Sequence, residues 1–263
     1  MVAQQTPVPV MADLHARGER PEYLFWVGCA GAYDDLYRKV TVAFTKILFH
    51  LEVSYAVLGK EESCTGDPAR RAGNELLYQM QALRNIDLFN LYSVRKILTI
   101  CPHCYNIFKN EYPDLGGCFE VISYLEFIDQ SLQSGKLVID TSVFRNVLVT
   151  YHDPCYLGRA NRIYEQPRKI LRTLAAKTVE MTRNRSSALC CGAGGGQYFK
   201  EAEKGTKEIF LERSEEAVAT GASVIATAFP FCMTMLTDGL KYMHKEEEII
   251  NLDIAEMIAK ALD

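Results

Sequence analysis

The chain lacks several features that would each define a class of protein. Its 263 residues contain no stretch of about 18 uncharged apolar residues, the length that a membrane-spanning helix needs. The net charge of −4 gives no basic excess and argues against nucleic acid as the main partner. The N-terminal segment has no apolar core of the kind that a signal peptide needs. We expect a cytoplasmic protein with no transmembrane segment of its own, which can associate with a membrane through a partner.

Signatures of nucleotide binding are also missing. No glycine fingerprint of a dinucleotide-binding fold is visible, so flavin or NAD is expected to bind to partner proteins. The glycine-rich segment 192–196 is followed by Gln197 and Tyr198. A phosphate-binding Walker loop needs Lys and then Ser or Thr at that point, which disfavours a phosphate site in this segment.

Cysteine is the residue type that the chain has in unusual supply. Nine cysteines are an odd number in a chain of this size, which disfavours a disulfide framework and favours metal or redox chemistry. One cysteine, Cys118, lies beside two glycines and is expected to be a small buried filler. The other eight are Cys29, Cys64, Cys101, Cys104, Cys155, Cys190, Cys191 and Cys232.

The spacing of these cysteines reveals an internal repeat. Cys155 follows Cys29 by 126 residues, and Cys190 follows Cys64 by the same 126 residues. The segment "CPHC" at 101–104 has its counterpart in "FPFC" at 229–232, which places Phe229 where the first copy has Cys101. We therefore predict two homologous halves. Residues 22–135 form the first cysteine-rich half, residues 146–263 form the second, and residues 1–21 are an N-terminal extension that is mobile or binds a partner.

Each half alternates apolar strand patterns with amphipathic helix patterns. In the first half, strands are expected near 23–29 and 96–100 and helices over 35–51 and 74–93; in the second, strands near 146–155 and 223–228 and helices over 162–176 and 201–221. This order predicts an α/β fold, with parallel-strand sheets flanked by helices and a pseudo-twofold internal repeat. In such sheets ligands gather beyond the carboxyl ends of the strands, where all the repeated cysteine motifs fall.

Four thiolates in each half can bind Zn²⁺ or an iron–sulfur cluster. A compact zinc site has two short CxxC segments, whereas the first half has one such segment and two isolated cysteines, which favours iron–sulfur without excluding zinc. Around the second set of cysteines, Phe231 is expected to form part of an apolar wall. The adjacent pair Cys190 and Cys191 suggests neighbouring iron atoms or one crowded metal.

Several motifs together resemble the cysteine-rich CCG domain family. They are "VGCAG", "ESCTGDPARRAGNE", "CPHC", "YHDPCYLGR", "CCGAGGG" and "FPFCMTML", and the resemblance covers nearly the whole chain. This domain occurs in the B subunit of heterodisulfide reductase and in iron–sulfur subunits of glycolate, lactate and glycerol-3-phosphate dehydrogenases. The first copy here has "CTG" where the family has "CCG", and Phe229 stands where the family has a cysteine.

The resemblance implies two iron–sulfur centres and electron transfer. The first centre would use Cys29, Cys64, Cys101 and Cys104, as a 4Fe–4S cluster or as zinc. The second would use Cys155, Cys190, Cys191 and Cys232, as a 4Fe–4S or an atypical cluster. The expected partners are a ferredoxin-like iron–sulfur subunit, a flavoprotein dehydrogenase subunit or both. The function expected is electron transfer within a multi-subunit oxidoreductase, in the manner of the B subunit of heterodisulfide reductase; the alternatives are a catalytic disulfide reductase at the second cluster and a non-redox scaffold with structural zinc.

Other residues near the cysteine motifs are candidates for supporting roles. Gly192, Gly194 and Gly195 are expected to bring backbone N–H groups close to a cofactor and to lead into a helix that starts near Gln197. His152 and Asp153 are candidates for proton relay, and His152 also for a metal ligand, although such residues also cap strand ends. Arg159 is a candidate for balancing cluster charge or for binding an anionic substrate. Trp26 is expected in the core, near enough to Cys29 to shield a cluster.

Overall fold

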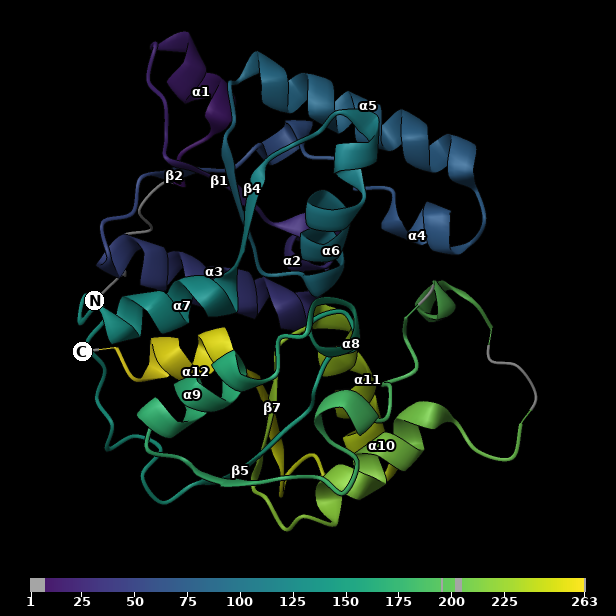
Figure 1. Cartoon of the computed structure of the whole chain (residues 1–263). Helices are drawn as coiled ribbons and strands as arrows, with labels where there is room; N and C mark the ends of the chain where they lie inside the picture. The colour runs from purple at the N-terminus through teal and green to yellow at the C-terminus, as the bar shows by residue number, and fades with distance from the viewer. Residues whose placement is uncertain (1–7, 195, 202–204, 263) are drawn as a thin grey trace.

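The computed structural model describes residues 8–194, 196–201 and 205–262. Its architecture is two four-stranded sheets, and within each sheet every strand pairs in parallel with its neighbours (Figure 1). The strand orders are β2-β1-β3-β4 and β6-β5-β7-β8, so both sheets have the same topology. The expected α/β fold with two homologous halves is confirmed. The strands are β1 (Tyr23–Trp26), β2 (Tyr55–Ala56), β3 (Lys96–Thr99), β4 (Glu120–Ser123), β5 (Leu148–Tyr151), β6 (Lys177–Val179), β7 (Val224–Thr227) and β8 (Ile250–Asp253).

Helices follow the strands of each half. In the N-terminal half they are α1 (Met11–Ala16), α2 (Gly28–Tyr33), α3 (Asp35–His50), α4 (Asp67–Arg71), α5 (Glu75–Leu91), α6 (Pro102–Asn110) and α7 (Tyr124–Gln133). In the C-terminal half they are α8 (Gly158–Asn161), α9 (Glu165–Thr173), α10 (Ile209–Val218), α11 (Pro230–Tyr242) and α12 (Ile254–Lys260). None of the helices in the described part of the chain is long and apolar enough to cross a membrane.

Strand register shows how closely the two halves correspond. Leu24 pairs with Ile97 in the first sheet, and Thr150, 126 residues after Leu24, pairs with Ile225 in the second. In the same register, Trp26 at the end of β1 corresponds to His152 just after β5. Phe229 directly precedes α11 as Cys101 directly precedes α6, so the alignment of these two residues is confirmed.

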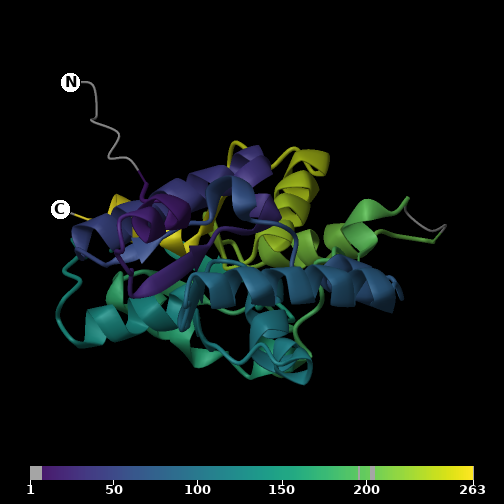
Figure 2. The same cartoon turned by 90° about the horizontal axis from the view of Figure 1, so that it is seen from above.

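The two halves share one hydrophobic core. Helices α3 and α7 of the first half and α9 and α12 of the second lie between the two sheets, and α12 packs on α3 while α7 packs on α9 (Figure 1). One buried cluster includes Phe25 and Leu98 from the first sheet and Val149 and Val224 from the second. Helix α1, in purple, and the yellow C-terminal helix α12 lie on the same side of the molecule, as the view from above also shows (Figure 2). This shared core holds the two sheets in a fixed relation.

Part of the expected N-terminal extension packs on the first half. Helix α1 buries Met11 and Leu14, and Val10 forms a parallel bridge with Val57 beside β2. The Met11 amide donates to the Val57 carbonyl at 2.8 Å. From Pro9 onward this segment therefore extends the edge of the first sheet.

The helix expected over 201–221 is shorter than the sequence suggests, and this prediction was wrong at its N-terminal end. Helix α10 begins at Ile209, and the glycine-rich segment leads instead into a single 3₁₀ turn, Gln197–Phe199. Residues 205–208 are exposed, whereas α10 buries Arg213 and Ala217. A short helix is stabilised mainly by burying one face, which residues before Ile209 do not provide.

Candidate metal centres in the two halves

The first candidate centre lies beyond the carboxyl ends of the strands in the first sheet. Cys29 lies in α2 after β1, Cys64 precedes α4, and Cys101 and Cys104 lie at the start of α6 after β3. All four line one cavity, together with Trp26 and other residues. The strand-end positions of a parallel sheet thus bring together four thiols from three segments that are far apart in sequence.

The protonation behaviour of Cys104 reflects how close these sulfurs are. The pKa of the Cys104 thiol is raised well above its usual value, first by its hydrogen bond to the Cys101 sulfur and then by burial. The Cys29 and Cys64 sulfurs raise it further. Four thiolates cannot share this space without a cation, and metal ions supply the charge that removes this repulsion.

The surroundings fit a group that carries sulfur atoms. Gly28 has φ +77°, and a Cβ at that residue would lie 3.5 Å from Cys104 Sγ and 3.8 Å from Trp26 Nε1. The Trp26 ring is fully buried, and its Nε1–H has no hydrogen-bond partner among the described residues. The Gly66 amide donates to Cys64 Sγ at 3.4 Å. Backbone and side-chain N–H groups therefore surround the four thiols, as at clusters that accept hydrogen bonds on sulfur.

The second candidate centre has the equivalent place in the second half. Cys191 Sγ and Cys232 Sγ lie 3.1 Å apart, and both residues are buried. The pKa of Cys191 is raised well above its usual value by hydrogen bonds to the Cys190 and Cys232 sulfurs and by burial. The pKa of Cys155 is raised chiefly because its thiol donates to the Cys190 sulfur. All four predicted cysteines of this half are thus linked through their sulfurs.

His152 lies against this second set of thiols. Its Nε2 is 3.2 Å from Cys232 Sγ, and its ligand atom falls in a group with those of Cys191 and Cys232 that spans less than 4.8 Å. On the other side of the ring, Arg213 Nε donates to His152 Nδ1 at 3.0 Å. Burial and then the Arg213 charge lower the pKa of His152 to about 3, so the ring is neutral. Nothing in the sequence of α10 indicated that Arg213 would be buried here.

The other two candidates for chemical roles, Asp153 and Arg159, make their hydrogen bonds to groups other than the thiols. Asp153 makes a bidentate ion pair with Arg168, with both distances 2.8 Å, and also accepts from the Arg185 amide. Arg159 is exposed and donates to the Ala188 carbonyl at 3.1 Å, which ties α8 to the loop before Cys190. Asp153 thus has its carboxylate occupied, whereas the Arg159 charge lies close enough to the centre to act on the Cys155 thiol.

The glycines of the second motif have different places. The Gly192 amide donates to Cys190 Sγ at 3.4 Å, and its φ of +93° is one that side chains disfavour. Apart from its chain neighbours, no described residue lies within 4 Å of the Cβ position of Gly194, and Gly195 lies outside the described residues. Gly192 therefore brings backbone to a cysteine sulfur, as expected.

Aromatic side chains connect the two centres. His103, from the "CPHC" segment, stacks on Phe229 of the second half and lies against Tyr156, with ring centroids 4.6 and 3.8 Å apart respectively. Its Nδ1 is 2.7 Å from the buried Asp67 carboxylate. Phe231, expected at the second centre, also lines the cavity of the first. Each half thus contributes a ring to the surroundings of the other half's centre.

One supporting contact and one cysteine differ from expectation. Both Glu62 carboxylate oxygens accept hydrogen bonds from backbone amides next to the first centre, from Val27 at 3.2 Å and Gly28 at 2.6 Å, a contact that no sequence pattern suggested.

Cys118 is exposed, so the prediction that it is a buried filler was wrong. It follows Gly116, whose φ of +87° turns the chain at the surface.

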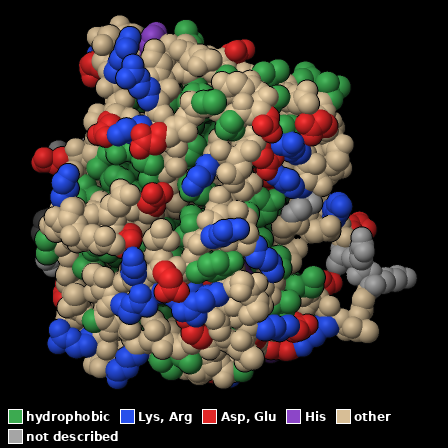
Figure 3. Space-filling model, in the orientation of Figure 1, with side chains coloured by type: hydrophobic (Ala, Val, Ile, Leu, Met, Phe, Trp, Pro, Cys, Tyr) green, Lys and Arg blue, Asp and Glu red, His purple; other side chains and the backbone are tan. Residues whose placement is uncertain are grey.

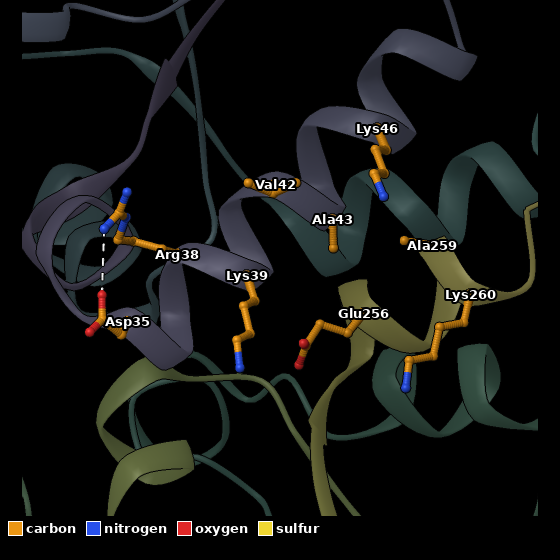
Figure 4. Close-up of a pocket in the computed structure, with 9 residues that line it drawn as sticks. All are labelled: Asp35, Arg38, Lys39, Val42, Ala43, Lys46, Glu256, Ala259 and Lys260. Carbon is orange, nitrogen blue, oxygen red and sulfur yellow. Dashed lines mark hydrogen bonds and ion pairs between the residues drawn. The ribbon is translucent and has the colours of Figure 1, made fainter. Parts of the chain in front are cut away.

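A larger cavity, of about 630 Å³, lies between α3 and α12, away from the cysteines. Figure 4 shows its charged lining, with the Lys39 amine directed toward Glu256 and an ion pair between Arg38 and Asp35. Elsewhere on the face shown in Figure 3, acidic and basic side chains are interspersed. The thiols therefore remain the distinctive chemical feature of the molecule.

Two parallel-sheet halves with equivalent sets of thiols at their carboxyl edges define a duplicated cysteine-rich α/β protein. The cysteine-rich domain family, CCG, matches residues 23–109 and again residues 149–237. The chain therefore belongs to this family, and the resemblance predicted from its motifs is confirmed.

Curated relatives extend well beyond this chain. A "probable iron-sulfur-binding oxidoreductase FadF" of Bacillus subtilis is 42% identical over 99% of this chain and 37% of its own length. An "EtfAB:quinone oxidoreductase" of Syntrophomonas wolfei is 40% identical over 94% of this chain and 35% of its own. The D subunit of the dihydromethanophenazine:CoB–CoM heterodisulfide reductase of Methanosarcina barkeri is 30% identical over 93% of this chain and 60% of its own length. The chain thus spans roughly a third to three fifths of these relatives.

Proposed function

We propose that this chain is the iron–sulfur, electron-transferring part of a larger oxidoreductase, similar to the B subunit of heterodisulfide reductase. The observation that carries the proposal is that four thiols converge at the equivalent edge of each of two sheets. The names of these three relatives, all oxidoreductases or reductase subunits, favour the same interpretation. An iron–sulfur cluster, when bound, supplies one-electron chemistry at a potential that its surroundings set.

The thiolates of each half would hold one group. Four thiols that line one cavity in the first half suit a 4Fe–4S cluster. In the second half the adjacent Cys190 and Cys191, and the presence of Phe229 at a position where the family has a cysteine, favour an atypical cluster. Trp26 and Phe231 line the first site, and Phe229 packs with Cys191 and Cys232 of the second. The aromatic stack between the halves gives a packed protein path from one centre to the other.

Disulfide cleavage and structural zinc are the alternatives. Cys191 and Cys232 are each only 1% exposed, and Phe229 fills the fifth position, which leaves a substrate disulfide little access to these two sulfurs. We therefore propose electron transfer as the role of the chain. We further propose that it acts in the cytoplasm, with ferredoxin-like or flavoprotein partners that can bring it to a membrane. None of His152, Asp153 and Arg159 is needed for bond cleavage in this role.

Metal and sulfide analysis after anaerobic purification tests this proposal. The wild-type chain should contain iron and acid-labile sulfide, and Cys104→Ser and Cys232→Ser should each lose about half of both. Cys118→Ser is the matched control, because Cys118 is exposed and has no counterpart in the repeat, and it should lose neither. Zinc at both sites without acid-labile sulfide would contradict the proposal.

A further inference from the structure

A side chain whose ring carries an N–H group stands at the equivalent position of each half, near the last cysteine of that repeat. It is Trp26 in the first half and His152 in the second. Trp26 is paired with Thr99 at the end of β1, and the His152 amide donates to the Ala226 carbonyl at the end of β5. Both side chains are fully buried. We propose that Trp26 and His152 each donate an N–H to a sulfur of the centre in their half, and that Arg213 fixes the tautomer in which His152 donates instead of ligating a metal.

The hydrogen bonds of His152 determine where its proton lies. A guanidinium group can only donate, so His152 Nδ1, which accepts from Arg213 Nε at 3.0 Å, must present a lone pair. The proton of the neutral ring is therefore on Nε2, which faces Cys232 Sγ at 3.2 Å. Ligation of a metal through Nε2 would place the proton on Nδ1 instead, against the Arg213 donor. The group formed by His152, Cys191 and Cys232 is thus two thiols and a hydrogen-bond donor.

Arg213 is held in this orientation by its other contacts. It is fully buried, and its Nη1 donates to the Arg183 carbonyl at 2.8 Å and to the Glu216 carboxylate at 2.9 Å. The guanidinium plane is therefore fixed from two directions, and Nε can only point at the histidine. Arg213 acts through His152 and is a positioning residue.

Trp26 supplies an N–H donor at the first centre without a second residue to orient its proton. An indole Nε1–H is always protonated and can only donate, so it has no tautomer to fix. This N–H has no partner among the described residues, and a buried donor left unpaired destabilises the folded state. It lies beside Gly28, on the side where Cys104 Sγ also approaches. A sulfur of a cluster held by the four thiols is the acceptor that this position provides.

The consequence concerns the potentials of the two centres, and it rests on the proposed iron–sulfur function. N–H donors stabilise the more negative, reduced form of a cluster, and therefore raise its potential. Removing one ring should lower the potential of the centre in that half and leave the centre in the other half unchanged.

The tautomer can be tested without any cluster. Long-range ¹H–¹⁵N spectra of protein labelled with ¹⁵N-histidine report which ring nitrogen carries the proton, and His152→Gln identifies the signals of His152. We expect the Nε2-protonated form in both the metal-free and the metal-loaded protein. A proton on Nδ1 in either state would overturn the inference. Absence of iron and sulfide would instead contradict the proposed function, while the metal-free spectrum would still decide the tautomer.

Redox titrations of the loaded protein test the effect of each donor. Trp26→Phe should lower only the first potential and His152→Leu only the second, with iron and sulfide content retained. His152→Gln, which keeps an N–H, should restore part of the loss, and Arg213→Met should reproduce the effect of His152→Leu. Unchanged potentials in both Trp26→Phe and His152→Leu at full iron content would overturn the inference. If His152→Leu loses its cluster, the inference is still decided by the tautomer of His152 in the wild-type protein and by the potential measured for His152→Gln.

Discussion

The imidazole of His103 in the first half lies face to face with the ring of Phe229 in the second half, with centroids 4.6 Å apart and planes inclined by 18°. His103 belongs to the "CPHC" segment, and Phe229 holds the position that corresponds to Cys101. The position of a possible fifth thiol at the second centre is therefore used for a contact between the halves. Tyr156 packs on the imidazole as well, which completes the stack.

Phe229→Cys should change the second centre. It adds a fifth thiol beside Cys191 and Cys232, so we expect altered iron content or an altered EPR signal from that centre alone. It also removes the stack on His103, at a cost of about 3 kcal/mol in the free energy of unfolding. Phe229→Leu is the control, since it removes the stack without adding a thiol. Identical spectra for the two variants would mean that residue 229 does not face the cluster.

Gly28→Ala should impair the first centre and leave the second intact. Gly28 has φ +77°, where an L side chain costs about 1 kcal/mol, and the new methyl group would occupy space in contact with Cys104 Sγ, at 3.5 Å. Gly73→Ala imposes a similar backbone strain at φ +86°, and apart from its chain neighbours no described residue lies within 4 Å of the new atom. Iron content should fall in Gly28→Ala and stay unchanged in Gly73→Ala. Equal iron content in both variants would contradict the close approach of the Gly28 backbone to the first centre.

Asp153 should prove structural. It and Arg168 are each 4% exposed and form a bidentate pair, and Arg168 also pairs with Glu180 at 2.7 and 2.8 Å. Asp153→Ala therefore removes one of the two carboxylates that compensate a buried cation, and we expect a loss of about 3 kcal/mol in the free energy of unfolding, measured by denaturant titration. A double variant, Asp153→Asn with Arg168→Gln, should recover much of that loss while the potentials stay at wild-type values. A change in potential at unchanged stability would instead assign Asp153 to the chemistry of the centre.

Asp253 should make stability depend on pH. It caps α12 in the core between the halves, where burial raises its pKa to about 8. Tyr37 Oη lies 3.0 Å from the Ile100 carbonyl and 3.3 Å from Asp253 Oδ2. Hydrogen bonds from Tyr124, from Tyr37 and from the Ala255 amide favour the charged carboxylate, but complete burial outweighs them. The folded state therefore favours the neutral carboxyl.

The direction of this dependence follows from the raised pKa. Below the unfolded-state pKa of about 4, Asp253 is protonated in both states and its contribution to stability is complete. As the pH rises from about 4 to about 8, the unfolded chain releases the proton first, and stability falls by up to about 1.4 kcal/mol per pH unit. Asp253→Asn should remove this slope in unfolding experiments, whereas Asp238→Asn, at an exposed site, should keep it. A slope that survives in Asp253→Asn would contradict the assignment.

The sequence was sufficient to predict the repeat, the two central strands of each sheet and the convergence of the cysteines, but not the edge strands β4 and β8. Such features depend on local periodicity and on the rule that ligands gather at the carboxyl ends of parallel strands. The contacts of His103 with Phe229 and of Phe231 with the first centre depend on how the two halves pack, which no local pattern encodes. Arg213 was missed for a related reason, because a charged residue in a helix with several exposed charges gives no sign that it faces inward.

The ends of some elements were equally hard to predict. Helix α10 begins at Ile209 because the residues before it have no apolar face to bury, although their composition is compatible with a helix. Residues 9–16 are too few to show a helical period, yet Met11 and Leu14 are buried in a short helix beside β2. In both cases tertiary burial decided the outcome.

An EPR-monitored redox titration of the anaerobically purified protein tests the central claim most directly. We predict two reversible one-electron centres, of which Cys104→Ser removes one and Cys232→Ser removes the other. A protein that shows no reversible reduction, with zinc bound in place of iron, would contradict that claim.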